Sequence, residues 1–86
     1  MLKMPDYGEN LGNLLRRARR FHGYTQNAVA KQLGISRTAY TYYETGKSLP
    51  SIITLKKLAE IFRLPPEAIF CPETLLKDEA FWEKSS

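Results

Sequence analysis

Residues that begin and end helices occur so often in this chain that only short helices fit between them. The ends are glycines that follow runs of helix-forming residues, where a left-handed residue stops a helix: Gly23, Gly34 and Gly46. The beginnings are residues whose side chains cap a first turn: Thr25, Ser36 and Ser51. No segment shows a convincing strand pattern, so the sequence predicts an all-α fold.

Apolar residues recur at helical spacing within these segments. We expect helices over about 9–21, 26–33, 37–44 and 52–62, and a short fifth helix through 69–70 after a pair of prolines. The third helix is expected to bury Ala39, Tyr40 and Tyr43. The fourth is expected to bury Ile52, Leu55, Leu58, Ala59 and Phe62. Together they predict a compact five-helix domain.

A chain of 86 residues is long enough for one hydrophobic core. We expect that core within residues 1–72, followed by a tail over 73–86 that can form an additional helix. The tail carries four large apolar residues without one clean stripe: Leu75, Leu76, Phe81 and Trp82. Because little of the core remains to cover them, we expect the fifth helix and the tail after it to form a dimer interface, or the tail to bind a protein partner. The alternative is that it folds back on its own domain.

The net charge of +4 is unevenly distributed. Residues 1–70 carry eleven basic and five acidic side chains, whereas residues 71–86 carry two basic and four acidic ones. The basic character of residues 1–70 suits the binding of a polyanion, although a solvated basic surface without a partner explains the charge equally well. The arginines on the outer face of the first helix, Arg16, Arg17 and Arg20, are interpreted as such a solvated face.

Several classes of protein do not fit this composition. The apolar stretches are only a few residues long and residues 1–7 lack the features of a secretory signal, so we expect a cytoplasmic protein that does not enter a membrane. A single cysteine, Cys71, cannot form an internal disulfide, and the single histidine, His22, lacks the further ligand residues that a metal site needs. With no phosphate-cradling glycine loop and no paired carboxylates on one buried face, we expect neither an enzyme nor a cofactor.

Residues 25–44 form the most informative stretch, because they read as a capped helix, a three-residue turn with Gly34, and a second capped helix. Ala30 and Ala39 allow the two helices to approach closely. Two short helices joined in this way form the unit whose second helix enters the major groove of DNA. The outward face of that helix carries side chains that can contact base edges: Arg37, Thr38, Thr41 and Tyr42.

This stretch and its surroundings resemble the lambda-repressor-like family of helix-turn-helix proteins, also called the Cro or XRE type. The resemblance covers residues 10–70. The residues on which the resemblance rests are Arg19, Gly23-Tyr24-Thr25-Gln26, Ala30, Leu33-Gly34-Ile35-Ser36, Tyr43-Glu44-Thr45-Gly46-Lys47, Pro50-Ser51 and Leu55 to Ala59. So many features in one order make the match specific.

The resemblance implies roles for individual residues. It implies base contacts from Arg37, Thr38 and Tyr42, a phosphate contact from Gln26 that also braces the recognition helix, and a charged pair between Arg19 and Glu44. Thr41, on the same outward face, is added to the residues predicted to contact bases. The residues predicted to bind phosphate are Gln26, Ser36, Thr45 and Lys47. Two positions depart from the family pattern: Tyr40 stands where a smaller aliphatic residue is more usual, and Thr45 replaces the usual asparagine.

Two functions follow as hypotheses. The first is a homodimeric transcriptional regulator of the repressor or controller type that binds a palindromic operator in double-stranded DNA. The second is a protein-interaction adaptor or antitoxin-type module that keeps the fold and uses the acidic, aromatic tail. The presence of Gln26, Lys47 and a polar outward face on the third helix favours DNA.

Overall fold

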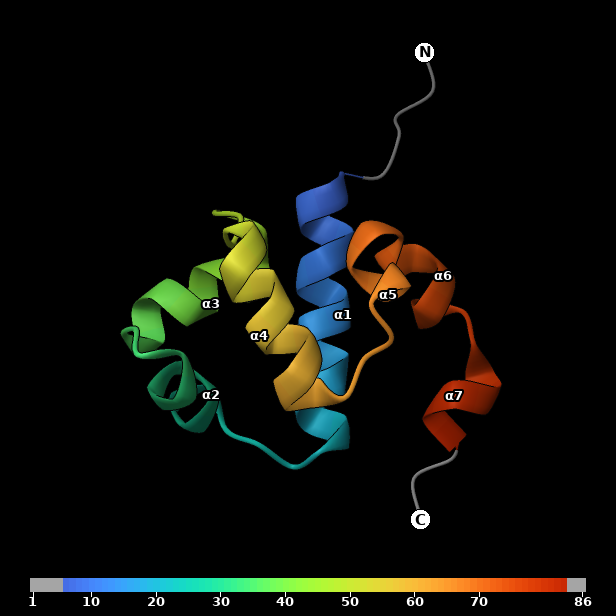
Figure 1. Cartoon of the computed structure of the whole chain (residues 1–86), viewed down its shortest axis with the longest axis horizontal. Helices are drawn as coiled ribbons and strands as arrows, with labels where there is room; N and C mark the ends of the chain where they lie inside the picture. The colour runs from blue at the N-terminus through green and yellow to red at the C-terminus, as the bar shows by residue number, and fades with distance from the viewer. Residues whose placement is uncertain (1–5, 84–86) are drawn as a thin grey trace.

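The computed structural model describes residues 6–83, and all five expected helices form within them. The elements are α1 (Tyr7–Phe21), α2 (Gln26–Leu33), α3 (Arg37–Thr45), α4 (Ile52–Phe62), α5 (Glu67–Phe70), α6 (Pro72–Leu76) and α7 (Glu79–Glu83) (Figure 1). These residues contain no strand, which confirms the all-α class. The exact count of five is not confirmed for the described chain, because the tail, in which one additional helix was considered, contains the two short helices α6 and α7.

Local side-chain chemistry determines where the longer helices begin and end. The predicted caps accept hydrogen bonds from the backbone N–H three residues ahead, at 3.0, 3.1 and 3.2 Å: Thr25, Ser36 and Ser51. Asp6 caps α1 through a bond of 3.2 Å from the Gly8 N–H, so this helix begins two residues earlier than expected. The predicted stops adopt φ angles of 74°, 72° and 78°: Gly23, Gly34 and Gly46. At the end of α4 the left-handed position is occupied by Arg63, at a φ of 54°.

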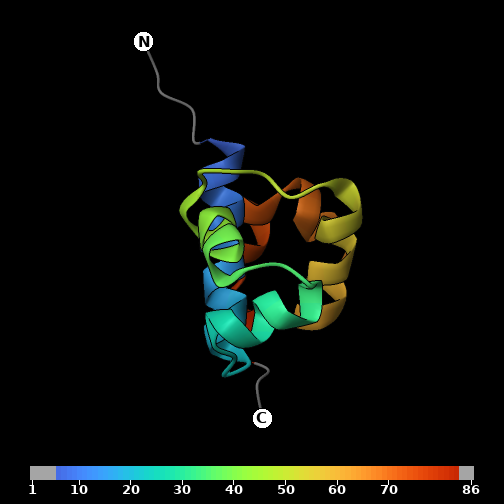
Figure 2. The same ribbon diagram turned by 90° about the vertical axis from the view of Figure 1, so that its left-hand side faces the viewer.

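Helix α1 runs through the middle of the molecule, with α2 and α3 on one side and α5 and α6 on the other (Figure 1). The view from the side shows α3 lying directly against α1 (Figure 2). The approach is so close that a Cβ atom on Gly12 would lie 2.3 Å from the carbonyl oxygen of Glu44. Position 12 therefore requires glycine because a side chain would overlap the backbone of α3.

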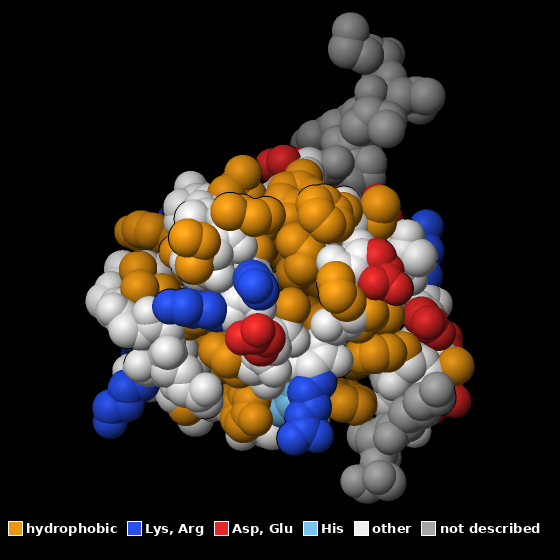
Figure 3. All heavy atoms as spheres, viewed as in Figure 1, with side chains coloured by type: hydrophobic (Ala, Val, Ile, Leu, Met, Phe, Trp, Pro, Cys, Tyr) orange, Lys and Arg blue, Asp and Glu red, His pale blue; other side chains and the backbone are white. Residues whose placement is uncertain are grey.

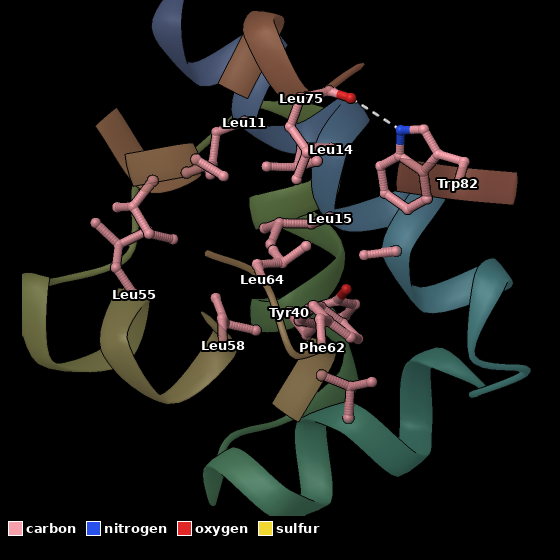
Figure 4. Packing of buried hydrophobic residues seen from close by; sticks show 14 of the residues in the cluster. Leu11, Leu14, Leu15, Tyr40, Leu55, Leu58, Phe62, Leu64, Leu75 and Trp82 are labelled. Carbon is pink, nitrogen blue, oxygen red and sulfur yellow. Dashed lines mark hydrogen bonds between the residues drawn. The ribbon is translucent and has the colours of Figure 1, made fainter. Parts of the chain in front are cut away.

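The hydrophobic core lies between α1, α3 and α4 and extends to the tail (Figure 4). Its largest fully buried side chains are Tyr40, Phe62, Leu11, Leu14, Leu15, Leu58, Val29 and Pro72. Tyr40 is thus a core residue, as expected. The expectation for Ile52 is wrong: 66% of this residue is exposed, although Leu55 in the same turn of α4 is buried in the core.

The tail folds back on its own domain. Leu75 and Trp82 are both 7% exposed, and Leu76 and Phe81 pack against the same core. The indole N–H of Trp82 donates to the carbonyl oxygen of Leu75 at 2.9 Å (Figure 4). The guanidinium of Arg17 lies 4.7 Å from the centre of the Trp82 ring. Leu75 and Trp82, two of the apolar side chains expected to need a dimer partner or a protein partner, are therefore covered by the chain itself, whereas Leu76 and Phe81 are only partly buried.

Among the described residues, no helix combines the length and the apolar character needed to cross a membrane.

Candidate nucleic-acid interface

A buried carboxylate holds the inner side of α3 in place. Glu44, near the end of α3, is 3% exposed. The Arg19 guanidinium donates to both oxygens of this carboxylate, from Nε at 2.6 Å and from Nη2 at 3.2 Å, so the contact expected between the two residues is present. Gln26 donates a third bond, from Nε2 at 3.0 Å. Since a buried charge without partners is costly, these bonds tie α1, α2 and α3 into one arrangement.

The electrostatics of this network favour the ionised pair. Burial, the largest single effect, acts to raise the pKa of Glu44, but the hydrogen bonds from Arg19 and Gln26, the nearby Tyr40 hydroxyl and the charge of Arg19 together outweigh it, and the pKa of the carboxyl lies below its ordinary value. The hydrogen bond to Glu44 likewise raises the pKa of Arg19. Burial raises the pKa of Tyr40, which lies beside the pair, so its hydroxyl stays protonated. The arrangement therefore favours an ionised Glu44 carboxylate held by the Arg19 guanidinium.

Thr41 belongs to this brace as well as to the recognition helix. Its side chain is half-buried, and the hydroxyl donates to Oε1 of Gln26 at 3.2 Å. The amide of Gln26 is therefore held from two sides, by Thr41 and by Glu44, and one Nε2 proton stays available. The sequence pattern did not show that α2 covers Thr41, which had been expected on the outward face.

The outward face of α3 presents three of the four predicted base-contacting side chains to solvent. Arg37 and Thr38 in the first turn are exposed, and Tyr42 is 43% exposed one turn further on. These residue types offer a bidentate donor, a hydroxyl and an amphipathic ring to whatever lies against the helix. The contacts of Glu44 fix the inner side of α3, whereas its outer side is exposed to solvent.

The loop after α3 adds a basic group beside this face. The ammonium group of Lys47 lies 5.5 Å from the centre of the Tyr42 ring, and the Lys47 N–H donates to the Tyr42 carbonyl oxygen at 2.9 Å. The Thr45 hydroxyl donates to the same oxygen at 3.4 Å. Tyr42, Thr45 and Lys47 therefore form one exposed cluster at the end of α3.

A hollow of about 550 Å³ lies at the other end of this surface, where α2 begins. Six residues line it: Arg19, Tyr24, Thr25, Gln26, Asn27 and Arg37. The unpaired N–H groups of a helix start and nearby guanidinium groups attract an anion. Asn27 had not been singled out from the sequence. Its position next to Gln26 in the first turn of α2 could have indicated from the sequence that it lines this hollow.

Two further arginines of α1 act within the fold. Arg16 donates to the Glu44 carbonyl oxygen at 3.3 Å, and Arg17 donates to the Leu76 carbonyl oxygen at 3.3 Å. The first contact holds α1 to α3, and the second holds α1 to the tail. In the described part of the chain, no three His, Cys, Asp or Glu side chains gather as metal ligands would.

Comparison with known proteins gives consistent matches. A family model described as helix-turn-helix matches residues 15–69. The 10 kDa protein of the ImmF control region of Bacillus phage phi105 is 30% identical over 79 residues, which are 92% of this chain and 88% of that protein. No solved structure matches the chain.

Two further relatives are longer proteins. A prophage-derived HTH-type transcriptional regulator of Bacillus subtilis is 44% identical over 50 residues, 58% of this chain. A putative HTH-type transcriptional regulatory protein of Thermococcus kodakarensis is 39% identical over 66 residues, 77% of this chain. The matches span 46% and 20% of the lengths of these two relatives.

Proposed function

Because this chain belongs to the lambda-repressor-like helix-turn-helix family, we propose that it regulates transcription by binding a specific operator in double-stranded DNA. One observation carries the proposal. Helix α3 is braced on its inner side through Glu44, while Arg37, Thr38 and Tyr42 on its outer side remain exposed. A rigid short helix with an open polar face is what readout of the major groove requires.

Base contacts come from the exposed face of α3. Arg37 lies in the first turn, the part of a recognition helix that enters the groove deepest, and its guanidinium suits O6 and N7 of a guanine. Thr38 and Tyr42 follow on the same face, and both can donate to base acceptors or pack against a thymine methyl. The half-buried Thr41 contributes through Gln26, whose orientation it fixes.

Phosphate contacts flank this face on both sides. At the start of α2, the free Nε2 proton of Gln26 and the neighbouring N–H groups suit one phosphate. The Ser36 hydroxyl, whose oxygen caps α3, keeps its proton for a phosphate oxygen. Beyond the end of α3, Thr45 and Lys47 suit a second stretch of backbone. These contacts set the register and the affinity, whereas α3 sets the sequence preference.

One recognition helix contacts too few bases for strong specificity, so the operator consists of two half-sites read by two copies. The protein then acts as a repressor or controller by occupying a palindromic site. The competing hypothesis is an adaptor that binds protein through its acidic, aromatic tail. The burial of Leu75 and Trp82 within the domain favours the DNA-binding proposal over it.

Operator selection from random duplexes with the full chain tests this function. We expect one enriched, symmetric sequence. On that sequence and on a scrambled duplex, Arg37→Ala should lose about 1–3 kcal/mol of discrimination, whereas Lys47→Ala should weaken both duplexes equally and reduce the salt dependence. Lys57→Ala, a matched change on the exposed side of α4, should bind as the wild type does. Selection that enriches no sequence would refute the proposal.

A further inference from the structure

A hollow between α1 and the tail gathers basic side chains that the expected DNA-binding surface does not use. Its volume is about 490 Å³, and six residues line it: Asn13, Arg16, Arg17, Arg20, Phe21 and Trp82. None of the residues expected to contact the bases or phosphates of an operator is among them. The folded-back tail supplies one wall through Trp82, so the sequence pattern, which indicated only a solvated helix face, could not show the hollow.

The positive charges in this hollow lack partners of opposite sign. On the face of the molecule that Figure 3 shows, basic side chains alternate with acidic and hydrophobic ones. In the hollow, by contrast, Arg17 and Arg20 lie three residues apart on α1, and no carboxylate among residues 6–83 forms an ion pair with either of them. Arg16 shares the Glu44 carboxylate with Arg19. Because like charges three and four residues apart on a helix repel one another, a bound anion would stabilise α1.

Two of the three guanidinium groups are already held in position. The guanidinium of Arg17 lies 4.7 Å from the centre of the Trp82 ring and donates through Nη1 to the Leu76 carbonyl oxygen. Arg16 donates through Nη2 to the Glu44 carbonyl oxygen. Each of these hydrogen bonds uses one of the several N–H groups of a guanidinium, so most of the donors remain available for a ligand. Side chains that are ordered before binding lose less entropy when a ligand arrives.

We propose that this hollow binds a small anion with two or more phosphate groups, either an inorganic phosphate chain or a nucleoside di- or triphosphate. The planar guanidinium fork binds phosphate oxygens through pairs of parallel hydrogen bonds. Arg16 and Arg20 are one helical turn apart, about 6 Å along the axis, so they suit a chain of phosphates better than a single phosphate. Asn13, at the other end of the hollow, offers an amide to the rest of the ligand.

The dimensions of the hollow favour a small ligand over an acidic segment of another protein. The stretch from Asn13 to Arg20 is only about 10 Å long, at about 1.5 Å per residue. A volume of about 490 Å³ lies within the usual range for small-molecule sites, about 300–1,000 Å³. A stable protein interface needs about 20–30 residues on each side, far more than the six that line this hollow.

Isothermal titration calorimetry of the full chain with tripolyphosphate, and separately with ATP, tests this site. Both titrations are run without divalent cations at about 0.15 M salt, where exposed charges more than about 8 Å away are largely screened. We expect one ligand per chain. Arg17→Gln and Arg20→Gln should each weaken the binding of tripolyphosphate by about tenfold or more. Lys57→Gln, which removes the same charge from the exposed side of α4, should bind as the wild type does.

The Arg20→Gln variant separates a loss of binding from a loss of folding. Its side chain forms no hydrogen bond or ion pair with another residue of the described chain, and glutamine is a good helix former. Circular dichroism should therefore show the wild-type helix content and a melting temperature at least as high as that of the wild type. Tripolyphosphate should raise the melting temperature of the wild type and not that of Arg20→Gln.

Each outcome of the titrations has a definite meaning. Tighter binding of ATP than of tripolyphosphate would identify a nucleotide as the ligand, and equal affinities would identify the phosphate chain alone; both results support a phosphate site. A wild type that binds neither probe would overturn the inference. So would binding that survives Arg17→Gln and Arg20→Gln but is lost in Lys47→Ala, because the anion would then occupy the DNA-binding surface.

Binding to duplexes tests the remaining alternative, a contact between this hollow and the DNA backbone. Arg20→Gln should bind every duplex as the wild type does, with the same salt dependence. If it weakened binding to all duplexes equally and reduced the salt dependence, the hollow would belong to the DNA interface and the inference of a separate site would be wrong. The calorimetry needs no operator, so a failure of the proposed function would leave its result standing.

Discussion

Replacing Gly12 with alanine tests how strictly the contact between α1 and α3 is defined. The added Cβ would lie 2.3 Å from the Glu44 carbonyl oxygen, 2.8 Å from the Glu44 carbonyl carbon and 3.0 Å from the Tyr43 carbonyl oxygen. All three atoms belong to the backbone of α3, so no side-chain rotation relieves the overlap. The two helices must move apart, and that movement pulls Glu44 away from Arg19.

The magnitude follows from two opposing effects. An overpacked core costs about 1–3 kcal/mol, and a clash against backbone belongs at the upper end of that range. Alanine is a better helix former than glycine by about 0.5–1 kcal/mol, which offsets part of the loss. We therefore expect a net destabilisation of about 2 kcal/mol, which lowers the melting temperature of a domain of this size by about 8–16 °C.

Thermal and urea unfolding followed by circular dichroism measure this loss. Gly8→Ala is the matched control on the same helix, because its Cβ would meet the mobile Leu49 side chain at 3.3 Å and no backbone at clashing distance. It should melt close to the wild type. A Gly12→Ala protein that melts at or above the wild-type temperature would show that α3 is free to shift on α1, and the account of a rigid recognition helix would then be wrong.

Three further predictions concern stability. Glu44→Ala leaves Arg19 without its partner and should cost about 3–5 kcal/mol in urea unfolding, whereas a loss below 1 kcal/mol would mean that the pair contributes no more than a surface ion pair. Because the pKa of Glu44 is lowered in the fold, its stabilisation is fully present above the ordinary carboxyl pKa and is lost as the pH falls through the lower value, so acid should destabilise the wild type more steeply than Glu44→Gln below about pH 4. Arg63→Gly relieves a left-handed φ of 54° and should raise stability by about 0.5–1 kcal/mol, while Arg63→Ala, which keeps that conformation strained, should not.

Helix boundaries could be predicted well because they depend on neighbouring residues. A cap such as Thr25, Ser36 or Ser51 bonds to an N–H only three residues away, so its effect can be recognised from the sequence alone. The contact between Arg19 and Glu44 spans 25 residues. It was predictable because both lie at the margin of an apolar face and both match positions in a known family.

The errors arose where the outcome depends on which surfaces meet. Helical spacing places Ile52 on the buried side of α4, yet Ile52 is 66% exposed whereas Leu55, three residues further on, is buried. Thr41 lies on the outward side of α3 by spacing, but α2 comes near enough for a hydrogen bond. Leu75 and Trp82 seemed to be in excess of the core because spacing alone does not show how much of α1 remains uncovered.

The return of the tail gives this protein a built-in optical probe. Trp82 is the single tryptophan of the chain, and its ring contacts both the Arg17 guanidinium, 4.7 Å from its centre, and the Phe21 ring, with ring centres 5.4 Å apart. Its fluorescence therefore reports on the seating of residues 79–83, while the far-ultraviolet signal comes mostly from α1 to α4. Following both signals in one titration distinguishes detachment of the tail from loss of the whole fold, without any label.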